Sequence, residues 1–528
     1  MVEIRRDLDR LLPVFAAALT VAVALWASSP YAVGVFHDDG VYAILGKSIA
    51  TGQGYRFLHL PGAPAATHYP PGYPLLLALV WKIAPNFPDN VPAFLFANAL
   101  LLGAVTFGVY WFATAVLDWR PRAAAAVAIV ATLSTPLLML SSLVLSEPMF
   151  AALLFPVVIG AERLVRDDDG DTRRTVLVAL GLGVLALVRT HAIALTIALL
   201  AVLVARRRWR TAFLCAVVTG ATLIPWQLWL LAHAGGIGGS LSGSYGTYSA
   251  WLFDGASGGG LPFIARTILL NAREVGALFA DHFAIADGAR TRMVASLIAL
   301  TLTAIGAWRA AKRSPVFVVF AIVYAMILLV WPFTPWRFVY AVWPAVVLFI
   351  GETVALVVTW RPNANGALRV AVALMLAVVC IGAVREETRA YSQRSWSRPA
   401  ADATAQIAPL LRWVVARTNA KDVLAVDGEQ LVFLFTGRRA VPVAPFTAAE
   451  YIHPRTAEQN AASLRQLIQD VPVDYIATIS PGHRSSGEML ADATAGAPIN
   501  PGGVKVVGLT PLAAGEAFRV DRAVRLVR

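Results

Sequence analysis

The chain has 528 residues, of which 58% are hydrophobic and only 14% are charged, and its mean hydropathy is +0.65. Soluble domains carry about a quarter of their residues as charged side chains, so this composition excludes an ordinary soluble enzyme and predicts that most apolar surface faces lipid. The net charge of +12 comes from small basic groups between apolar runs, so no nucleic acid is expected as a partner. Cys215 and Cys380 both lie in apolar runs, where ordinary packing is expected. Neither a disulfide framework nor a zinc site is expected from them.

Apolar runs long enough to cross a bilayer recur along the chain, which predicts a mainly α, polytopic transmembrane bundle of about 11 spans. The first run follows Arg5 and Arg6 and is longer than the core of a signal peptide, so we expect it to be retained. The spans are expected near residues 12–33, 92–117, 122–140, 147–165, 174–188, 190–205, 211–233, 291–309, 315–333, 337–359 and 368–385.

Basic side chains occupy alternate loops between these runs, which fixes the expected orientation of the chain in a plasma (inner) membrane. The clusters are Arg120 and Arg122; Arg166, Arg173 and Arg174; Arg206, Arg207, Arg208 and Arg210; Lys312 and Arg313; and Arg361 and Arg369. Because positive charge stays on the cytoplasmic side, the N-terminus is predicted inside. Residues 34–91, 234–290 and everything after about 387 are then predicted outside.

The outside segment from Gly235 to Gly260 is rich in Gly and Ser, with Tyr245, Tyr248 and Trp251 among them. This composition predicts a mobile segment with aromatic side chains. It fits a lid over a site and equally a flexible connector at the membrane interface, where Tyr and Trp are common.

The tail changes in composition and predicts a small α/β domain over residues 391–528, outside the membrane and separate from the transmembrane domain 1–390 with its external loop 34–91. A helix is expected through Leu410 to Arg417 and a strand at Val423–Val426. A second helix is expected to open at Thr456, with Gln459 three residues later, before a strand over Val473–Ile479. The tail contains no phosphate-loop or dinucleotide signature.

The first outside loop carries adjacent carboxylates, Asp38 and Asp39, at the end of a span. Two acids at a membrane surface repel each other and are costly to desolvate, so they serve a cation, a proton transfer or the capping of a helix. Capping is the simpler interpretation, because a helix is expected from Val41 to Ala50 with a turn at Gly52.

Two further charged residues stand at predicted outer ends of spans. Glu147 opens the fourth span, where a carboxylate also suits the positive end of the helix dipole. Arg337 lies outside against the general trend and therefore requires an anionic partner or a snorkelling position. Arg189 and His191 fall in an outside turn between two short spans, where interfacial snorkelling competes with a functional role.

These motifs resemble those of the GT-C superfamily of membrane glycosyltransferases. The first is the acidic pair with Tyr42 four residues after Asp38, a helix, a Gly-aromatic turn and then the Pro-Pro-x-x-Pro of Pro70 to Pro74. The others are LSEPMF at Leu145–Phe150 and PWRFVYAVWP at Pro335–Pro344. The likeness is strongest to the branch of bacterial protein O-mannosyltransferases and lipid A aminoarabinose transferases, although Val41 stands where the latter carry a basic residue.

The resemblance implies an inverting transfer of a sugar from a polyprenyl-phosphate-linked donor to a glycan, lipid or protein acceptor outside the membrane. It implies these roles: Asp38 as general base; Asp39 and Glu147 positioning the acceptor or an optional divalent cation, Mg²⁺ or Mn²⁺; Arg337, Lys47, His68 and Arg189 binding the donor phosphate; and Tyr42, Tyr69, His191 and Tyr340 binding substrate. The alternative is a multi-pass transporter or flippase for a lipid-linked or anionic solute, in which the same charges line a pathway.

Overall fold

The computed structural model describes residues 2–167, 171–237, 239–359, 366–480, 483, 485–486, 489, 505–514 and 518–526. By its internal contacts the chain forms two compact units. Unit 1 comprises Met1–Ser29, Leu95–Trp226 and Ala265–Arg398, and unit 2 comprises Pro30–Phe94, Gln227–Ile264 and Pro399–Arg528. Unit 2 thus combines the predicted external loop with the tail, a grouping that follows contacts and not chain order.

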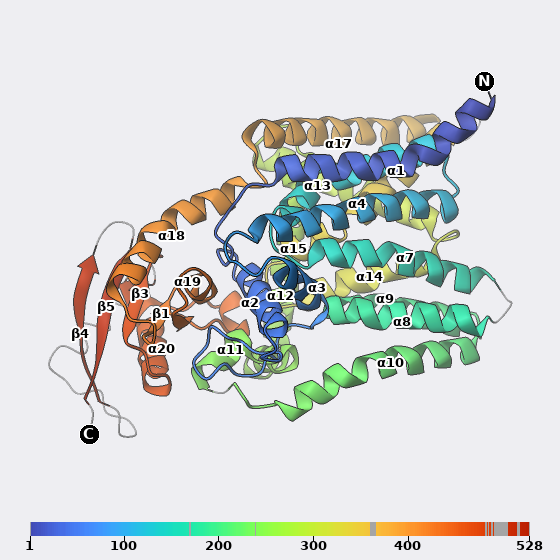
Figure 1. The fold of residues 1–528 in the computed structure, drawn as a ribbon. Helices are drawn as coiled ribbons and strands as arrows, with labels where there is room; N and C mark the ends of the chain where they lie inside the picture. The colour runs from blue at the N-terminus through green and yellow to red at the C-terminus, as the bar shows by residue number, and fades with distance from the viewer. Residues whose placement is uncertain are drawn as a thin grey trace. The chain divides into compact units, whose positions relative to one another are not determined.

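Unit 1 is helical, and α1, α4, α7 and α8 run side by side in it (Figure 1). Its helices are α1 (Val2–Ala27), α4 (Val91–Ala115), α5 (Pro121–Leu133), α6 (Thr135–Ser141), α7 (Glu147–Arg166), α8 (Thr172–Val188), η1 (Thr190–Ala192), α9 (Ile193–Ala205), α10 (Trp209–Ala232), α13 (Ala289–Ala310), α14 (Pro315–Val330), α15 (Trp336–Ala341), α16 (Trp343–Thr359) and α17 (Gly366–Gln393). Of these, α4 and α10 also have residues in unit 2, as does α12 (Tyr248–Phe283).

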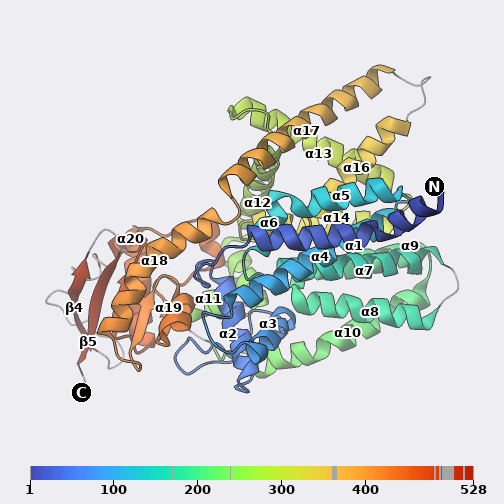
Figure 2. The same cartoon turned by 45° about the horizontal axis from the view of Figure 1, so that its top comes forward.

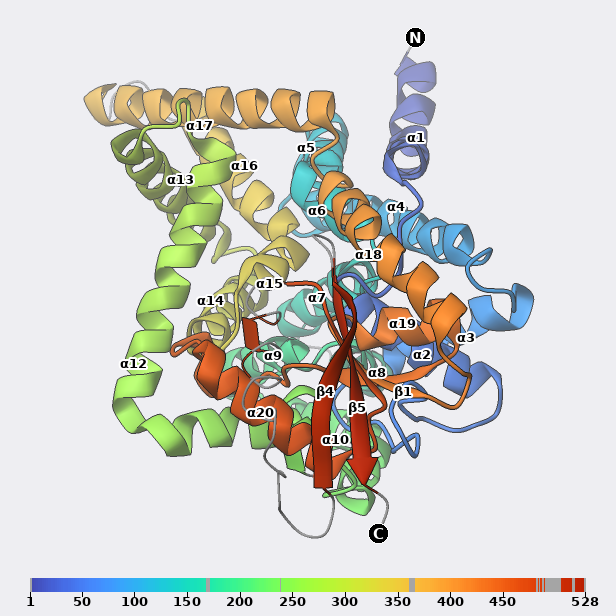
Figure 3. The same cartoon turned by 90° about the vertical axis from the view of Figure 1, so that its left-hand side faces the viewer.

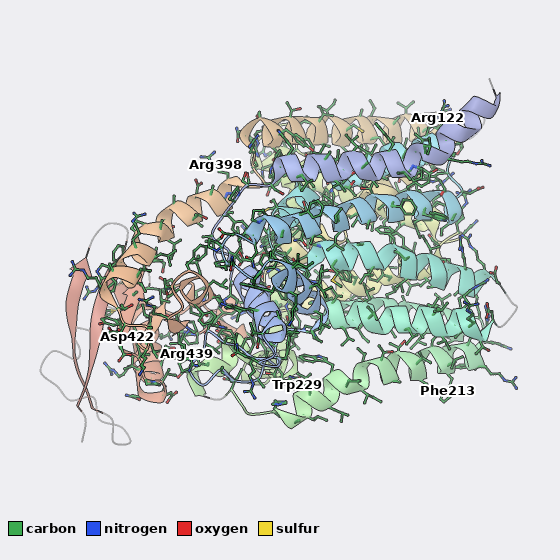
Figure 4. All side chains as sticks on the ribbon, viewed as in Figure 1. Arg122, Phe213, Trp229, Arg398, Asp422 and Arg439 are labelled. Atoms are coloured by element: carbon green, nitrogen blue, oxygen red, sulfur yellow. The ribbon has the colours of Figure 1, made fainter. Side chains whose placement is uncertain are left out.

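A helix or a helix pair occupies every predicted span, so the mainly α, membrane-type architecture is confirmed. Within the described residues, six helices are long and apolar enough to cross a membrane, or seven if α5 and α6, which meet at 59°, count as one. Shorter apolar helices such as α9, α14 and α16 lie at further predicted spans. The exposed side chains of these helices are often apolar, as Phe213 on α10 illustrates with 72% of its surface exposed (Figure 4).

The core of unit 1 is continuous, and its helices approach one another closely. Large side chains such as Phe112, Phe155 and Phe317 are fully buried in it. Gly306 in α13 permits one close approach, because a Cβ atom there would lie 1.7 Å from the carbonyl oxygen of Phe349 in α16. Small residues allow such backbone contacts between membrane helices, where lipid supplies no hydrophobic driving force for association.

Arginines of the predicted cytoplasmic clusters bind the carbonyl ends of helices in unit 1. Arg166 donates to the carbonyl of Val116 at 2.7 Å, after the end of α4. Arg206 donates to the carbonyl of Val165 at 2.9 Å, at the end of α7. Because the last carbonyls of a helix have no partner within it and carry partial negative charge, these cations stabilise the helix ends.

Unit 2 contains a five-stranded sheet of order β2-β1-β3-β5-β4. Its strands β4 and β5 lie side by side (Figures 2 and 3). The strands β1 (Val423–Val426), β2 (Arg439–Pro442) and β3 (Tyr475–Thr478) are parallel, and β5 (Arg519–Leu526) pairs antiparallel with β3 and with β4 (Lys505–Ala514). Around it lie α18 (Arg398–Arg417), α19 (Glu429–Thr436), η3 (Ala448–Tyr451) and α20 (Ala457–Asp470). The other helices of the unit are α2 (Asp38–Ala50), α3 (Gly72–Ile83), η2 (Gly239–Leu241) and α11 (Ser242–Tyr245).

The tail confirms most of its predicted elements. Strand β1 has the predicted bounds, and β3 lies inside the predicted range. Thr456 is the N-cap of α20, and the side chains of Thr456 and Gln459 form the predicted capping box. Side chains from α18, β1 and β3, with Leu410, Leu424 and Ala477 among them, form one buried cluster.

Two local predictions in unit 2 are wrong. Neither acid caps the helix after them, because α2 begins at Asp38 itself and His37 takes the N-cap position with a φ of 62°. The Gly- and Ser-rich segment is also not a mobile loop throughout, since η2, α11 and α12 form in it and the side chain of Tyr245 is completely buried. A buried aromatic anchor overrides the flexibility that the composition favours.

Candidate functional site

Unit 1 brings together three of the predicted residues, Glu147, Arg189 and Arg337. Glu147 is the first residue of α7, Arg189 ends α8, and Arg337 lies in the first turn of α15. Oε1 of Glu147 is 2.8 Å from Nε of Arg337 and 2.9 Å from Nη1 of Arg189. The same Nη1 donates to Oγ of Ser146 at 2.9 Å. Two guanidinium groups therefore share one carboxylate oxygen.

This cluster is buried. The side chain of Glu147 has no exposed surface, and those of Arg189 and Arg337 are 8% and 12% exposed. Guanidinium groups bind oxyanions through paired N–H donors, so two of them held together at one carboxylate suit an anionic ligand. The predicted alternative for Arg189, snorkelling at the interface, is wrong because its side chain is buried and paired.

Aromatic rings lie beside Arg189. Cζ of Arg189 lies 5.0 Å from the ring centre of Phe338, within the range of a cation–π contact. The ring of His191 packs against Phe338 and Trp331 at 4.5 and 5.2 Å between centres. His191, predicted to bind substrate, is thus a neighbour of the arginine cluster through Phe338. Tyr340, also predicted to bind substrate, packs its ring against those of Trp336 and Trp343.

The two acids of unit 2 have different surroundings, and Asp39 faces the backbone. It is fully buried, and its Oδ2 accepts the N–H of Gly34 at 2.9 Å. Its Oδ1 accepts the N–H groups of Phe36 and Gly40 at 3.1 and 2.9 Å. Burial raises the pKa of Asp39 to about 6, although these hydrogen bonds act in the opposite direction. Asp39 therefore stabilises the turn that precedes α2.

Asp38 is only partly buried and contacts a side chain. The hydroxyl of Tyr69 donates to its Oδ1 at 2.7 Å. Tyr69 is buried, and burial raises its phenol pKa well above the usual value, so the hydroxyl stays a donor. Tyr42 meets Tyr69 and Tyr73 edge to face, at 5.2 and 5.1 Å between ring centres. The structure thus brings together three predicted residues: Asp38, Tyr69 and Tyr42.

Two predicted phosphate ligands in unit 2 lie in environments that suit other roles. Nδ1 of His68 is 2.6 Å from the carbonyl oxygen of Gly246, so Nδ1 carries a proton. Burial lowers the pKa of His68 to about 4, which leaves it neutral near pH 7. The ammonium of Lys47 lies 5.4 and 5.6 Å from the ring centres of Trp81 and Phe433, so cation–π packing accounts for its position.

Two of the three carboxylates predicted for a divalent cation have other ligands in this structure. Both oxygens of Asp39 already accept backbone N–H groups, and Oε1 of Glu147 is bound by two cations. Hard ions such as Mg²⁺ need carboxylate oxygens that are available to them. In the part of the chain that the structure describes, no group of three His, Cys, Asp or Glu side chains is placed to hold a metal ion.

Sequence reasoning missed one cluster of polar side chains in unit 2, formed by the buried His59, Tyr245, Glu429 and Gln430 and by the partly exposed His37. The hydroxyl of Tyr245 bonds to Glu429, to Nε2 of His59 at 2.9 Å and to Nε2 of Gln430 at 2.6 Å. These residues come from three distant segments, so no local pattern could have connected them.

A comparison with protein-family models gives no match, and neither does one with curated protein sequences. Solved structures do match. ArnT from Cupriavidus metallidurans bound to undecaprenyl phosphate has a TM-score of 0.56 at 13% identity, over 97% of each chain. The archaeal oligosaccharyltransferase AglB from Archaeoglobus fulgidus, in complex with an inhibitory peptide and a dolichol-phosphate, has a TM-score of 0.54 at 13% identity, over 90% of this chain and 70% of that one.

ArnT in the apo state matches as well, with a TM-score of 0.51 over 96% of this chain. Structural matches at these TM-scores and identities establish a shared fold. The shared architecture, together with the helices at every predicted span, shows that this chain has the fold of the GT-C membrane glycosyltransferases.

Proposed function

We propose that this protein is an inverting glycosyltransferase that moves a sugar from a polyprenyl-phosphate carrier to an acceptor hydroxyl on the outer side of the plasma membrane. The observation that carries the proposal is the buried cluster in which Arg189 and Arg337 share one oxygen of Glu147. It lies in a chain that has the fold of enzymes solved with lipid phosphates.

The arginine cluster supplies what a donor phosphate requires. Guanidinium groups bind phosphate oxygens through two parallel N–H donors, and they remain charged at any physiological pH. Glu147 holds both guanidiniums in place, so that their N–H donors are fixed where they can bind the oxygens of a phosphodiester. This role differs from the catalytic or metal-binding one predicted for Glu147, and the ion pairs support it better.

Asp38 is the proposed general base. It accepts the proton of the acceptor hydroxyl while that oxygen forms a bond to the anomeric carbon of the sugar. The bond from this carbon to the phosphate oxygen breaks on the opposite face, and the polyprenyl phosphate leaves with the electron pair. The arginines stabilise the charge that develops on the leaving phosphate. One displacement of this kind inverts the anomeric configuration.

Further roles follow from the surroundings of these groups. The hydrogen bond from Tyr69 orients the carboxylate of Asp38. Tyr42, Tyr69, His191 and Tyr340 remain the proposed substrate contacts, with a glycan, lipid or protein as acceptor. None of these steps requires a divalent cation.

The decisive experiment is native mass spectrometry of lipids that co-purify with the protein. The Asp38→Asn variant should retain an uncleaved polyprenyl-phospho-sugar, since loss of the base stops transfer without removing the phosphate site. The mass of that lipid would identify the sugar class. If Asp38→Asn transfers sugar at the wild-type rate, its assignment as base is wrong. If wild-type and variant carry only bulk phospholipid after incubation with undecaprenyl-phospho-sugars, the transporter alternative is favoured.

A further inference from the structure

Two buried polar residues of the tail, Glu429 and Gln430, stand at the start of α19. The exposed surface of Glu429 is 3% and that of Gln430 is 0%. Polar groups buried this deeply are costly unless they are hydrogen-bonded, and an apolar pair would pack there at lower cost. Their hydrogen-bond partners therefore show what these two residues do.

The first connection leads to His68 through Tyr245. The Tyr245 hydroxyl donates to the carboxylate of Glu429 and accepts from Nε2 of Gln430 at 2.6 Å. The next residue, Gly246, offers the carbonyl oxygen that Nδ1 of His68 binds at 2.6 Å. The backbone that fixes the tautomer of His68 is thus attached to α19 through the adjacent aromatic side chain.

The second connection leads to Asp38 through His37. Nε2 of Gln430 lies 2.7 Å from Nδ1 of His37, the N-cap residue directly before Asp38. Because an amide nitrogen of this kind only donates, Nδ1 of His37 is the acceptor. The left-handed φ of His37, 62°, is a strained conformation that needs such support from its surroundings.

The backbone of this turn also lies directly on α19. A Cβ atom added to Gly40 would lie 2.6 Å from Cβ of Gln430. One added to Gly34, which has a φ of 115°, would lie 2.6 Å from Cβ of Leu431. Only glycine permits both approaches, so the turn around Asp38 and the start of α19 form one packed piece.

We infer that Glu429 and Gln430 are positioning residues of the proposed glycosyl transfer, through which the tail orients the general base Asp38. The inference rests on the proposed function and extends it, because it gives the tail a part in the reaction. Neither side chain contacts substrate in this scheme. The donor-phosphate cluster of unit 1 does not depend on them.

The test compares Gln430→Met and Glu429→Leu with the conservative Glu429→Gln, which keeps an oxygen that accepts from Tyr245. Gln466→Met is the matched control, because it makes the same replacement at an exposed position of α20. Full-length variants are assayed for release of undecaprenyl phosphate from a panel of undecaprenyl-phospho-sugars, with solubilised cell-envelope material as acceptor. Affinity for undecaprenyl phosphate and the unfolding temperature are measured in parallel.

We expect Gln430→Met and Glu429→Leu to lower kcat roughly a hundredfold, the effect of a displacement of about 1 Å in a catalytic group. The affinity for undecaprenyl phosphate should match the wild type, and Glu429→Gln should recover most of kcat. An unchanged kcat overturns the inference. So does a parallel loss of kcat, lipid affinity and unfolding temperature without recovery in Glu429→Gln, since that pattern means a purely structural role. A wild-type protein that neither turns over nor binds undecaprenyl phosphate refutes the proposed function on which the inference depends.

Discussion

Replacing Arg337 with Met tests the donor-phosphate site directly. In the wild type, two guanidiniums share one carboxylate oxygen of Glu147 in a buried cluster. Arg337→Met removes one guanidinium but leaves Glu147 paired with Arg189 at 2.9 Å. The buried carboxylate therefore keeps one cation, while a phosphate loses the N–H donors of the other.

The expected loss of affinity follows from the bonds removed. A hydrogen bond to a charged group contributes about 1.5–3 kcal/mol, which corresponds to roughly a tenfold to 150-fold weaker binding of undecaprenyl phosphate. The free energy of unfolding should change by about 1 kcal/mol or less, because the remaining Arg189–Glu147 pair is neutral and buried as before.

Glu147→Gln provides a change of opposite sign in the same cluster. It removes the carboxylate that two buried guanidiniums share, and removing one partner of a buried ion pair costs about 3–5 kcal/mol of stability. Undecaprenyl phosphate should raise the unfolding temperature of Glu147→Gln more than that of the wild type, because the phosphate replaces the missing negative charge. The double variant, with Arg189 alone, should lie between the two.

The assay is a titration of each purified variant with undecaprenyl phosphate, followed by native mass spectrometry and by thermal unfolding. Arg309→Met is the matched control, since Arg309 also pairs with a buried carboxylate of unit 1, that of Glu352, at 2.9 Å. Wild-type affinity in Arg337→Met, or equal loss in Arg309→Met, would refute the assignment of a phosphate site to this cluster.

Four further outcomes are expected. Burial raises the pKa of Asp39 from its ordinary value of 3.8 to about 6 in the folded protein. The stability that the protonated Asp39 contributes is therefore fully present below its pKa in the unfolded chain, and it is lost as the pH rises through 6. The unfolding temperature of the wild type should therefore fall from pH 4 to pH 7 relative to Asp39→Asn, and parallel curves would contradict this. Gly306→Ala should destabilise the fold by about 1–3 kcal/mol or more, because its Cβ would lie 1.7 Å from the carbonyl oxygen of Phe349. Gly220→Ala is the control, because a Cβ atom there would have no neighbour within 4 Å. Thermal unfolding should show that this second change is neutral or stabilising. Lys47→Met should bind undecaprenyl phosphate with an affinity within about twofold of the wild type, because the ammonium of Lys47 packs over aromatic rings. A tenfold loss of affinity would instead support the predicted role of Lys47 as a phosphate ligand. Sugar transfer should survive dialysis against EDTA, and activity that returns only with Mg²⁺ or Mn²⁺ would show that a metal is needed.

The sequence by itself determined the architecture of the membrane part and several elements of the tail. Hydrophobic runs and basic clusters are local properties of the chain, because a helix that crosses lipid satisfies its own backbone hydrogen bonds. The start of the fourth hydrophobic run is also a local property, and it places Glu147 at the first turn of a helix, as the structure confirms. The capping box at Thr456 and Gln459 and the strand Val423–Val426 also depend only on neighbouring residues.

The tertiary structure alone decided which polar groups act together. Asp38 and Asp39 are adjacent in sequence, but packing directs one toward Tyr69 and the other toward backbone N–H groups. Arg189 is a buried partner of Glu147, although its position in the sequence favoured interfacial snorkelling. Such pairings join residues that are far apart along the chain, and burial determines how strongly they interact, so no local pattern in the sequence contains them.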